Sequence, residues 1–285
     1  RSSTYGEPNG DYEAGCWLGT WGWTTNEGFE FHDGSCGACF STYLCSTNVA
    51  KAAPSPAPTS AAPTRSNTMS DARIRTAVRA WTEDRAAAEA TYGHISSWET
   101  SGVTDMSYLF CGRQDWMDSD PHYDDRCFLS ASFNEDIGAW DTSGVTRMYG
   151  MFWYASSFNQ NIGGWSVENV NEMGQMFNSA SSFDQDIGGW NVENVRDMHQ
   201  MFESASSFNQ NIGGWSVGQI TSMHRMFSDS AFNQDISAWA VDSVTDMHYM
   251  FNSASAFDQD LGWCVGGDVD LDDAFDDTQC ASTSC

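Results

Sequence analysis

Residues 157–181 read SFNQNIGGWSVENVNEMGQMFNSAS, and residues 182–206 read SFDQDIGGWNVENVRDMHQMFESAS. The same pattern runs from Ser132 to Cys280 in six copies, with a period of 25 residues that shortens once to 24. Repeats of about 20 to 50 residues are typical of stacked architectures, in which each unit buries its apolar side chains against its neighbours. The sequence therefore predicts a solenoid, whose long regular surface suits binding or assembly better than catalysis.

Nine apolar positions recur in each copy, too many for one exposed amphipathic element, so we expect them to line the inside of a coil. In the copy quoted first they are Phe158, Ile162, Trp165, Val167, Val170, Met173, Met176, Phe177 and Ala180. Spacing predicts a short helical or 3₁₀ turn over residues 170–177 and a short strand over residues 158–162, with Gly163 and Gly164 as the bend between them. Stacking would then produce a narrow parallel sheet on one side and short helical turns on the other.

A further copy, YGHISSWETSGVTDMSYLF at residues 92–110, brings the array to about seven coils. Two motifs identify it further: Phe-Asn-Gln-Asp-Ile before a Trp in residues 232–239, and Val-Thr-x-Met-x-x-Met-Phe in residues 244–251. They resemble the BspA-like leucine-rich repeat, in its bacterial and protist surface-protein branch with Trp and Met-Phe signatures, over roughly residues 91–280. The resemblance implies a right-handed α/β solenoid of the leucine-rich-repeat type at a cell surface or in a secreted matrix, without catalytic residues.

Composition favours an extracellular protein. The chain has nine cysteines, a formal net charge of −27 and one lysine among its twelve basic residues. Disulfide-rich chains belong to oxidising compartments, and nucleic-acid binding requires clustered positive charge, so we expect secretion and no nucleic-acid partner. Membrane insertion is not expected, because no apolar run reaches 18 residues. Since the first residue is Arg1 rather than Met, we also expect a processed product.

We expect four parts along the chain. Residues 1–49 form a small Cys-rich module and residues 50–69 a linker rich in Pro, Ala, Ser and Thr. Residues 70–93 form a capping helix. Residues 94–285 form the solenoid, with a disulfide-closed insertion near residues 111–127 and a C-terminal cap.

The first module contains Cys16, Cys36, Cys39 and Cys45, which we interpret as a disulfide framework of undetermined pairing. Zinc held by Cys36, Cys39, Cys45 and His32 is an alternative, although a second ligand pair with finger spacing is missing. In the linker, Ser55, Thr59, Ser60 and Thr64 are candidate O-glycan sites of a secreted glycoprotein. A bare linker fits that composition equally well.

Ser70 is typical of a helix N-cap, and Gly93 of a helix end. Ile74, Val78, Trp81 and Tyr92 share roughly one face of this predicted helix. Five arginines lie in it or just before it: Arg65, Arg73, Arg75, Arg79 and Arg85. They could dock on acidic repeats, but a solvated helix face is the favoured interpretation.

The remaining cysteines suggest two further disulfides. Cys111 and Cys127 would close the base of the inserted segment, and Cys264 with Cys280 is the favoured pair at the C-terminal cap. Cys285 would then be a free thiol or form a bridge to another chain.

Aligned copies contain two columns of Asn and Asp. The first is Asn134, Asn159, Asp184, Asn209, Asn233 and Asp258, and the second lies two residues further on, at Asp136, Asn161, Asp186, Asn211, Asp235 and Asp260. Alternating amides and carboxylates favour hydrogen-bonded ladders along the stack. Calcium is the alternative, with Asp184, Asp186, Asp258 and Asp260 as candidate ligands.

A third column contains His199, His224 and His248, each directly after a core Met. Zinc or copper was considered for it. No carboxylate is evidently placed to orient the rings, so an exposed polar row is favoured.

No nucleophile with a base and no nucleotide-binding motif occurs. A ligand in the insertion near Asp115, His122 and Asp124 would be the main sign of an enzyme. We therefore predict a non-enzymatic structural protein of a cell surface or extracellular filament, which assembles with copies of itself or with other extracellular proteins. The alternative is an adhesion or recognition module that binds carbohydrate or protein through the solenoid face.

Overall fold

The computed structural model describes residues 67–112, 127 and 131–279. Three helical elements occur in order: α1 (Asp71–Glu83), α2 (Arg85–Tyr92) and the 3₁₀ helix η1 (Ile95–Ser97). No strand is assigned within these described residues, and none of their helices is long and apolar enough to cross a membrane. The predicted Cys-rich module and nearly all of the linker lie outside them.

The helix predicted for residues 70–93 is present but is divided at Asp84. Ser70 caps α1 through its side chain. Asp84 has an extended backbone, and its carboxylate accepts the Ala87 backbone N–H at 3.1 Å, so it ends α1 and caps α2. Gly93, at φ 81°, ends α2 as predicted.

Helix α1 satisfies backbone groups that the first coil would otherwise leave without partners. Arg75 donates to the carbonyl oxygens of Ser107 and Asp105 at 2.8 and 3.2 Å. Asp71 accepts the Thr104 backbone N–H at 2.7 Å. In later coils the equivalent groups bond to the preceding coil. The two side chains therefore stand in for a missing coil, which satisfies buried polar groups at this end.

The arginines of α1 and α2 are divided between the two interpretations, and Arg79 is exposed as the favoured one predicts. Arg85 donates to both carboxylate oxygens of Glu135, at 2.7 and 3.0 Å, and Arg75 is bound as described above. Arg65 lies outside the described residues. The less favoured prediction, that arginines dock on the repeats of this chain, is thus correct for Arg75 and Arg85.

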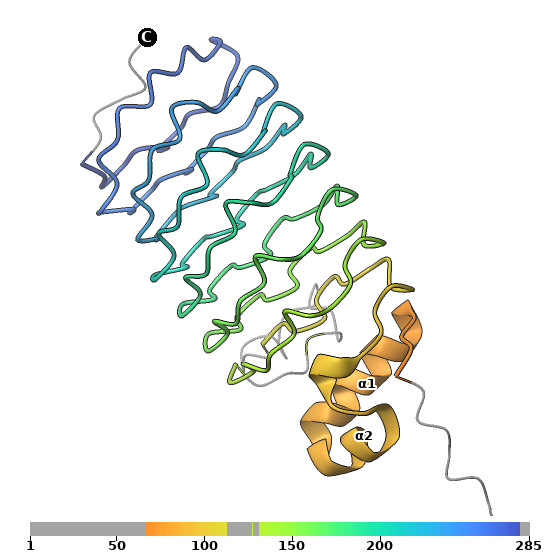
Figure 1. The fold of residues 1–285 in the computed structure, drawn as a ribbon. Coiled ribbons are helices and arrows are strands. Elements are labelled where there is room, and N and C mark those ends of the chain that lie inside the picture. The colour runs from red at the N-terminus through yellow and green to blue at the C-terminus, as the bar shows by residue number, and fades with distance from the viewer. Residues whose placement is uncertain (1–66, 113–126, 128–130, 280–285) are drawn as a thin grey trace, which may run out of the picture. The chain divides into compact units, whose positions relative to one another are not determined.

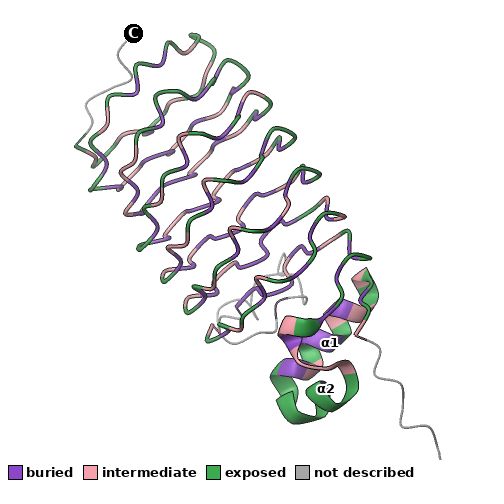
Figure 2. Cartoon of the chain, in the orientation of Figure 1, coloured by how far each residue is buried: buried purple, intermediate pink, exposed green. Residues whose placement is uncertain are grey.

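From residue 94 onward the chain forms successive coils that lie one on another (Figure 1). Each coil is one copy of the repeat. The nine predicted apolar positions of residues 158–180 are at most 4 % exposed, and buried segments face the interior of the coils (Figure 2). Burying one such large side chain contributes roughly 1.5 to 3 kcal/mol, so the interior columns stabilise the stack.

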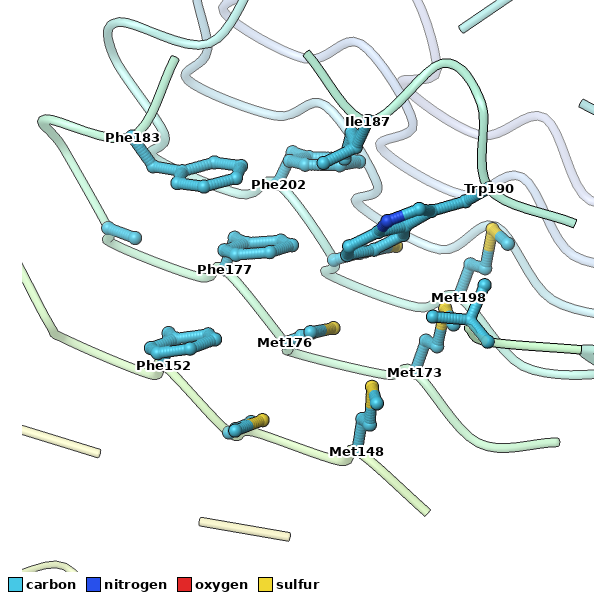
Figure 3. Packing of buried hydrophobic residues seen from close by; sticks show 14 of the residues in the cluster. Met148, Phe152, Met173, Met176, Phe177, Phe183, Ile187, Trp190, Met198 and Phe202 are labelled. Carbon is cyan, nitrogen blue, oxygen red and sulfur yellow. The ribbon is translucent and has the colours of Figure 1, made fainter. Parts of the chain in front are cut away.

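Phenylalanines form a continuous column through the stack (Figure 3). The ring centroids of Phe152 and Phe177 are 5.6 Å apart, as are those of Phe177 and Phe202. The indole N–H of Trp190 donates to the carbonyl of Ile162 in the preceding coil at 3.2 Å, which satisfies its buried polar group.

Backbone hydrogen bonds join the coils most regularly after each core Met. The N–H groups of Met173, Gln175 and Phe177 donate to carbonyls of the next coil at 2.9 to 3.1 Å. The N–H of Met176 instead donates back to Met173 within the coil. This alternation requires left-handed backbone at Gln175 and Ser179, both at φ 58°.

The local structure therefore differs from the prediction. Residues 174–179 form tight turns rather than the helical turn predicted over residues 170–177, and residues 158–162 are irregular rather than a strand. Parallel contact is limited to single bridges such as Glu172 with Asp197, directly before the core Met.

Gly163 and Gly164 lie at the predicted bend, in a turn that the bond from the Trp165 N–H to the Ile162 carbonyl closes at 3.1 Å, and the first of them has a further role. A Cβ on Gly163 would lie 2.5 Å from the carbonyl oxygen of Asp186 in the next coil, whereas a Cβ on Gly164 would meet nothing within 4 Å. Only the first glycine is therefore required, because a backbone passes close to it.

Candidate functional site

Two columns of side chains flank the core Met of each coil, and we call them together the bridge face. The residues before Met form the backbone bridges and are Asp105, Arg147, Glu172, Asp197, Ser222, Asp246 and, in the last coil, Asp270. The residues after that position are Ser107, Tyr149, Gly174, His199, His224, His248 and Asp272. Unlike the core, both columns vary in size, charge and hydrogen-bonding capacity along the stack, although the second column holds His in three successive coils.

The bridge face is hollowed in its first half. One open depression of about 830 Å³ is lined by polar side chains that include Glu172, Arg196, Asp197 and His199. A second, of about 300 Å³, lies beside it and shares Glu172 and Asp197. The shared carboxylates make the two depressions neighbours, so an elongated polar ligand could contact both.

Three side chains from two coils meet at the centre of this face. The Nδ1 atom of His199 lies 2.7 Å from a carboxylate oxygen of Asp197, and its Nε2 atom lies 3.4 Å from the Tyr149 hydroxyl. Gly174 lies between them: a Cβ there would be 2.7 Å from the His199 ring and 3.1 Å from the Tyr149 ring. The absence of a side chain at Gly174 thus allows contact across an intervening coil.

The protonation of this cluster follows from its surroundings. Burial alone would raise the pKa of Asp197, but hydrogen bonds from His199 outweigh it and hold the pKa below its ordinary value. Burial, followed by the neighbouring Tyr108, raises the pKa of Tyr149. At neutral pH the aspartate is therefore ionised and the phenol is neutral, which makes Tyr149 a donor for a bound ligand.

Aromatic and charged groups extend the site toward the first coil. The Tyr108 and Tyr149 rings are 5.3 Å apart in an edge-to-face arrangement. Arg147 and Glu172 form an ion pair at 2.9 Å in which both side chains stay substantially exposed. Such a pair is readily rearranged by a ligand, because an exposed ion pair contributes only about 0 to 1 kcal/mol.

The expectation that no carboxylate orients the histidines is wrong for His199, whose partner is Asp197. The signal was present in the sequence as Asp-Met-His, two residues apart, and it recurs at Asp246 and His248. Further along, the rings of His224 and His248 stack at 5.4 Å. Burial lowers the pKa of His224, which keeps that ring neutral at physiological pH.

Comparison with known proteins places the chain by its repeats. The family described as "Mycoplasma protein of unknown function, DUF285" matches residues 82–120, 125–231 and 187–284. The chain belongs to this family. No curated protein and no solved structure matches it. In this DUF285 chain the matched residues begin in the last turn of α1 and include all the coils, and the family description assigns them no activity.

The first Asn/Asp column of this DUF285 chain is a hydrogen-bonded ladder, which we call the amide ladder. The Asn209 side-chain oxygen accepts the backbone N–H of Asn233 at 2.8 Å and the side-chain amide of Gln234 at 3.0 Å. Asp184 accepts the N–H of Asn209 at 3.1 Å and the amide of Gln210 at 2.8 Å in the same way. The column thus ties each coil to the next.

The second Asn/Asp column is engaged within each coil. Asp186 and Asp260 each accept the backbone N–H two residues ahead, at 3.0 and 3.2 Å. Asp258 donates its backbone N–H to Asn233 at 3.0 Å. The four calcium candidates, Asp184, Asp186, Asp258 and Asp260, are therefore not gathered into one cluster of ligands; calcium stays an untested prediction.

The cysteine predictions have separate outcomes. Cys111 and Cys127 form the predicted disulfide, with Cα atoms 5.1 Å apart. Cys264 is exposed, and its predicted partner Cys280 lies outside the described residues. Also outside them are Cys16, Cys36, Cys39, Cys45, Cys285, the four O-glycan candidates and the three insertion residues.

Proposed function

We propose that this chain is an extracellular, non-enzymatic recognition module whose bridge face binds a polar partner, either carbohydrate or protein. The observation that carries the proposal is the contrast between a uniform interior and a bridge face that varies along the stack, from Tyr149 through Gly174 to His199 in three successive coils. A scaffold gains nothing from such variation, whereas a binding surface needs different groups at different places.

The chemistry of the face supports a polar ligand. Its first half presents the neutral Tyr149 hydroxyl, the ionised Asp197 and the ion pair of Arg147 with Glu172 beside two open depressions. These groups offer both donors and acceptors, and the Tyr108 and Tyr149 rings offer apolar surface. We further propose that the coils are a leucine-rich-repeat-like solenoid of the BspA-like type; the disulfide supports secretion.

Binding can be tested with the full chain on immobilised glycans and on surface extracts of its source. We expect Tyr149→Ala and Glu172→Ala each to weaken binding at least tenfold. Glu193→Ala, at an exposed position outside the bridge face, is the control and should bind like the wild type. Equal binding by all three variants would exclude the bridge face as the site.

Assembly into a cell-surface or extracellular filament is the second candidate function. The amide ladder favours it, since hydrogen bonds between adjacent coils from Asn134 to Asp258 produce a rigid body suited to a structural element. Sedimentation at rising concentration tests this candidate. A monomer throughout the range, with or without calcium, would exclude self-assembly.

A further inference from the structure

The last two described coils bring an imidazole and two carboxylates together at the end of the bridge face. Donor atoms of His248, Asp270 and Asp272 all lie within 4.8 Å of one another. This is the one such group of three among residues 67–112, 127 and 131–279. The parallel bridge between Asp246 and Asp270 sets its geometry, because it fixes the two coils in register.

His248 differs from His199, its counterpart two coils earlier. The Nδ1 atom of His199 lies 2.7 Å from the aspartate two residues before it. The equivalent Asp246 instead accepts the hydroxyl of Ser222 at 3.1 Å. The Nδ1 atom of His248 is therefore buried without a hydrogen-bond partner, and an Asp270 oxygen lies 3.8 Å away, beyond hydrogen-bonding distance. A buried ring nitrogen without a partner is unfavourable, and a ligand aligned with it would remove that cost.

Negative charge around the group is a second reason to expect a bound cation there. Asp270 and Asp272 are exposed, and four further aspartates lie within residues 268–277: Asp268, Asp273, Asp276 and Asp277. The Asp273 carboxylate raises the pKa of Asp276, the direction expected when carboxylates repel one another. A cation bound to His248, Asp270 and Asp272 would offset part of the negative charge of this segment.

We propose that His248, Asp270 and Asp272 bind a divalent transition-metal ion of the Zn²⁺ class. Imidazole and carboxylate groups both bind Zn²⁺, and three protein ligands with water in the fourth position are an established arrangement for it. Calcium fits this group less well, because it requires six to eight oxygen ligands. The site does not depend on the proposed recognition function.

Isothermal titration of the full chain with Zn²⁺, and separately with Ca²⁺, tests the proposal. We expect one Zn²⁺ site formed by these three residues. Its affinity for Zn²⁺ should fall at least tenfold in His248→Ala and in Asp272→Asn, and Ca²⁺ should bind more weakly than Zn²⁺. His199→Ala is the matched control, since it removes an imidazole from the same column and should retain the site.

Asp272 is exposed, so Asp272→Asn should fold normally, as circular dichroism can verify. Zn²⁺ held by other groups, such as the cysteines, would persist in both variants. If all Zn²⁺ binding persists in both variants, or if Ca²⁺ binds as tightly and is insensitive to His248→Ala, the proposal is wrong.

Discussion

The amide ladder and the bridge face belong to the same coils but differ in what their side chains bind. In the ladder, the Asn209 oxygen is used by a backbone N–H and an amide of the next coil. On the bridge face, regular backbone bonds such as that from Met173 to Asp197 join the coils, and side-chain links such as that between Arg147 and Glu172 occur only at some of them. Where side chains make the regular contact between coils they are limited to Asn and Asp, and where the backbone makes it the side chains vary more.

The largest effect is expected at Gly163, where the backbone of the next coil leaves no space for a side chain. Gly163→Ala would place a Cβ 2.5 Å from a backbone carbonyl of the next coil, which cannot rotate away. We expect a loss of about 2 to 3 kcal/mol in the free energy of unfolding, measured by urea denaturation. Gly164→Ala, with open space around it, should change stability by less than about 0.5 kcal/mol. Equal losses would refute the close-approach explanation.

A smaller effect is expected in the amide ladder itself. Asn209→Ala removes the acceptor of the Asn233 N–H and the Gln234 amide, and at an exposed site this should cost about 1 kcal/mol. Asn209→Asp keeps a side-chain oxygen and is the matched control, since Asp184 occupies this position in the preceding coil. A thermal-unfolding series distinguishes the two, and similar destabilisation by both would show that the acceptor is unimportant.

On the bridge face, a glycine substitution should affect contacts more than stability. Gly174→Ala would place a Cβ 2.7 Å from the His199 ring and 3.1 Å from the Tyr149 ring, and side-chain rings can move. We expect a stability loss below about 1 kcal/mol, together with separation of the two rings. Changes in the His199 and Tyr149 ring resonances in NMR spectra measure that separation. A loss as large as that of Gly163→Ala would contradict the distinction between the two sides.

The smallest effect at neutral pH concerns Asp197. Its pKa is below the ordinary value of about 3.9 in the folded state, so it adds stability above that pH, which is lost as the pH falls through the folded-state pKa. As the pH falls from about 5 to about 2.5, we expect the Asp197→Asn variant to lose less stability than the wild type does. Thermal unfolding across that range measures it, with the exposed Asp242→Asn as the control. An unchanged pH profile would mean that His199 does not stabilise the carboxylate.

The interior could be predicted from the sequence because buried positions recur as apolar residues with the period of the repeat. All nine predicted positions, from Phe158 to Ala180, are buried. The backbone conformation between these positions could not be predicted, because the spacing of apolar side chains carries no information on φ angles. Gln175 and Ser179 adopt left-handed backbone without being glycine, while Gly163 is required without adopting it. Contacts between coils select these conformations.

The candidate site was only partly predictable for a related reason. The histidine column was visible as a repeat position. The sequence does not show, however, which coil supplies the partner of each histidine or which rotamer each side chain adopts. Asp197 turns to His199, whereas Asp246 turns to Ser222. The variable bridge face became evident only once the position of the bridges was known.

The bonds that follow each core Met run from N–H to the carbonyl of the next coil, so their peptide dipoles add along the stack. The first coil is therefore the negative, acceptor pole, where the guanidinium of Arg75 is bound. The last described coil is the positive, donor pole, and it carries Asp273, Asp276 and Asp277. Arg75 at one end and these aspartates at the other thus match the dipoles of these bonds, whereas Asp71 at the first end accepts the Thr104 N–H, at a position whose later bonds run the opposite way.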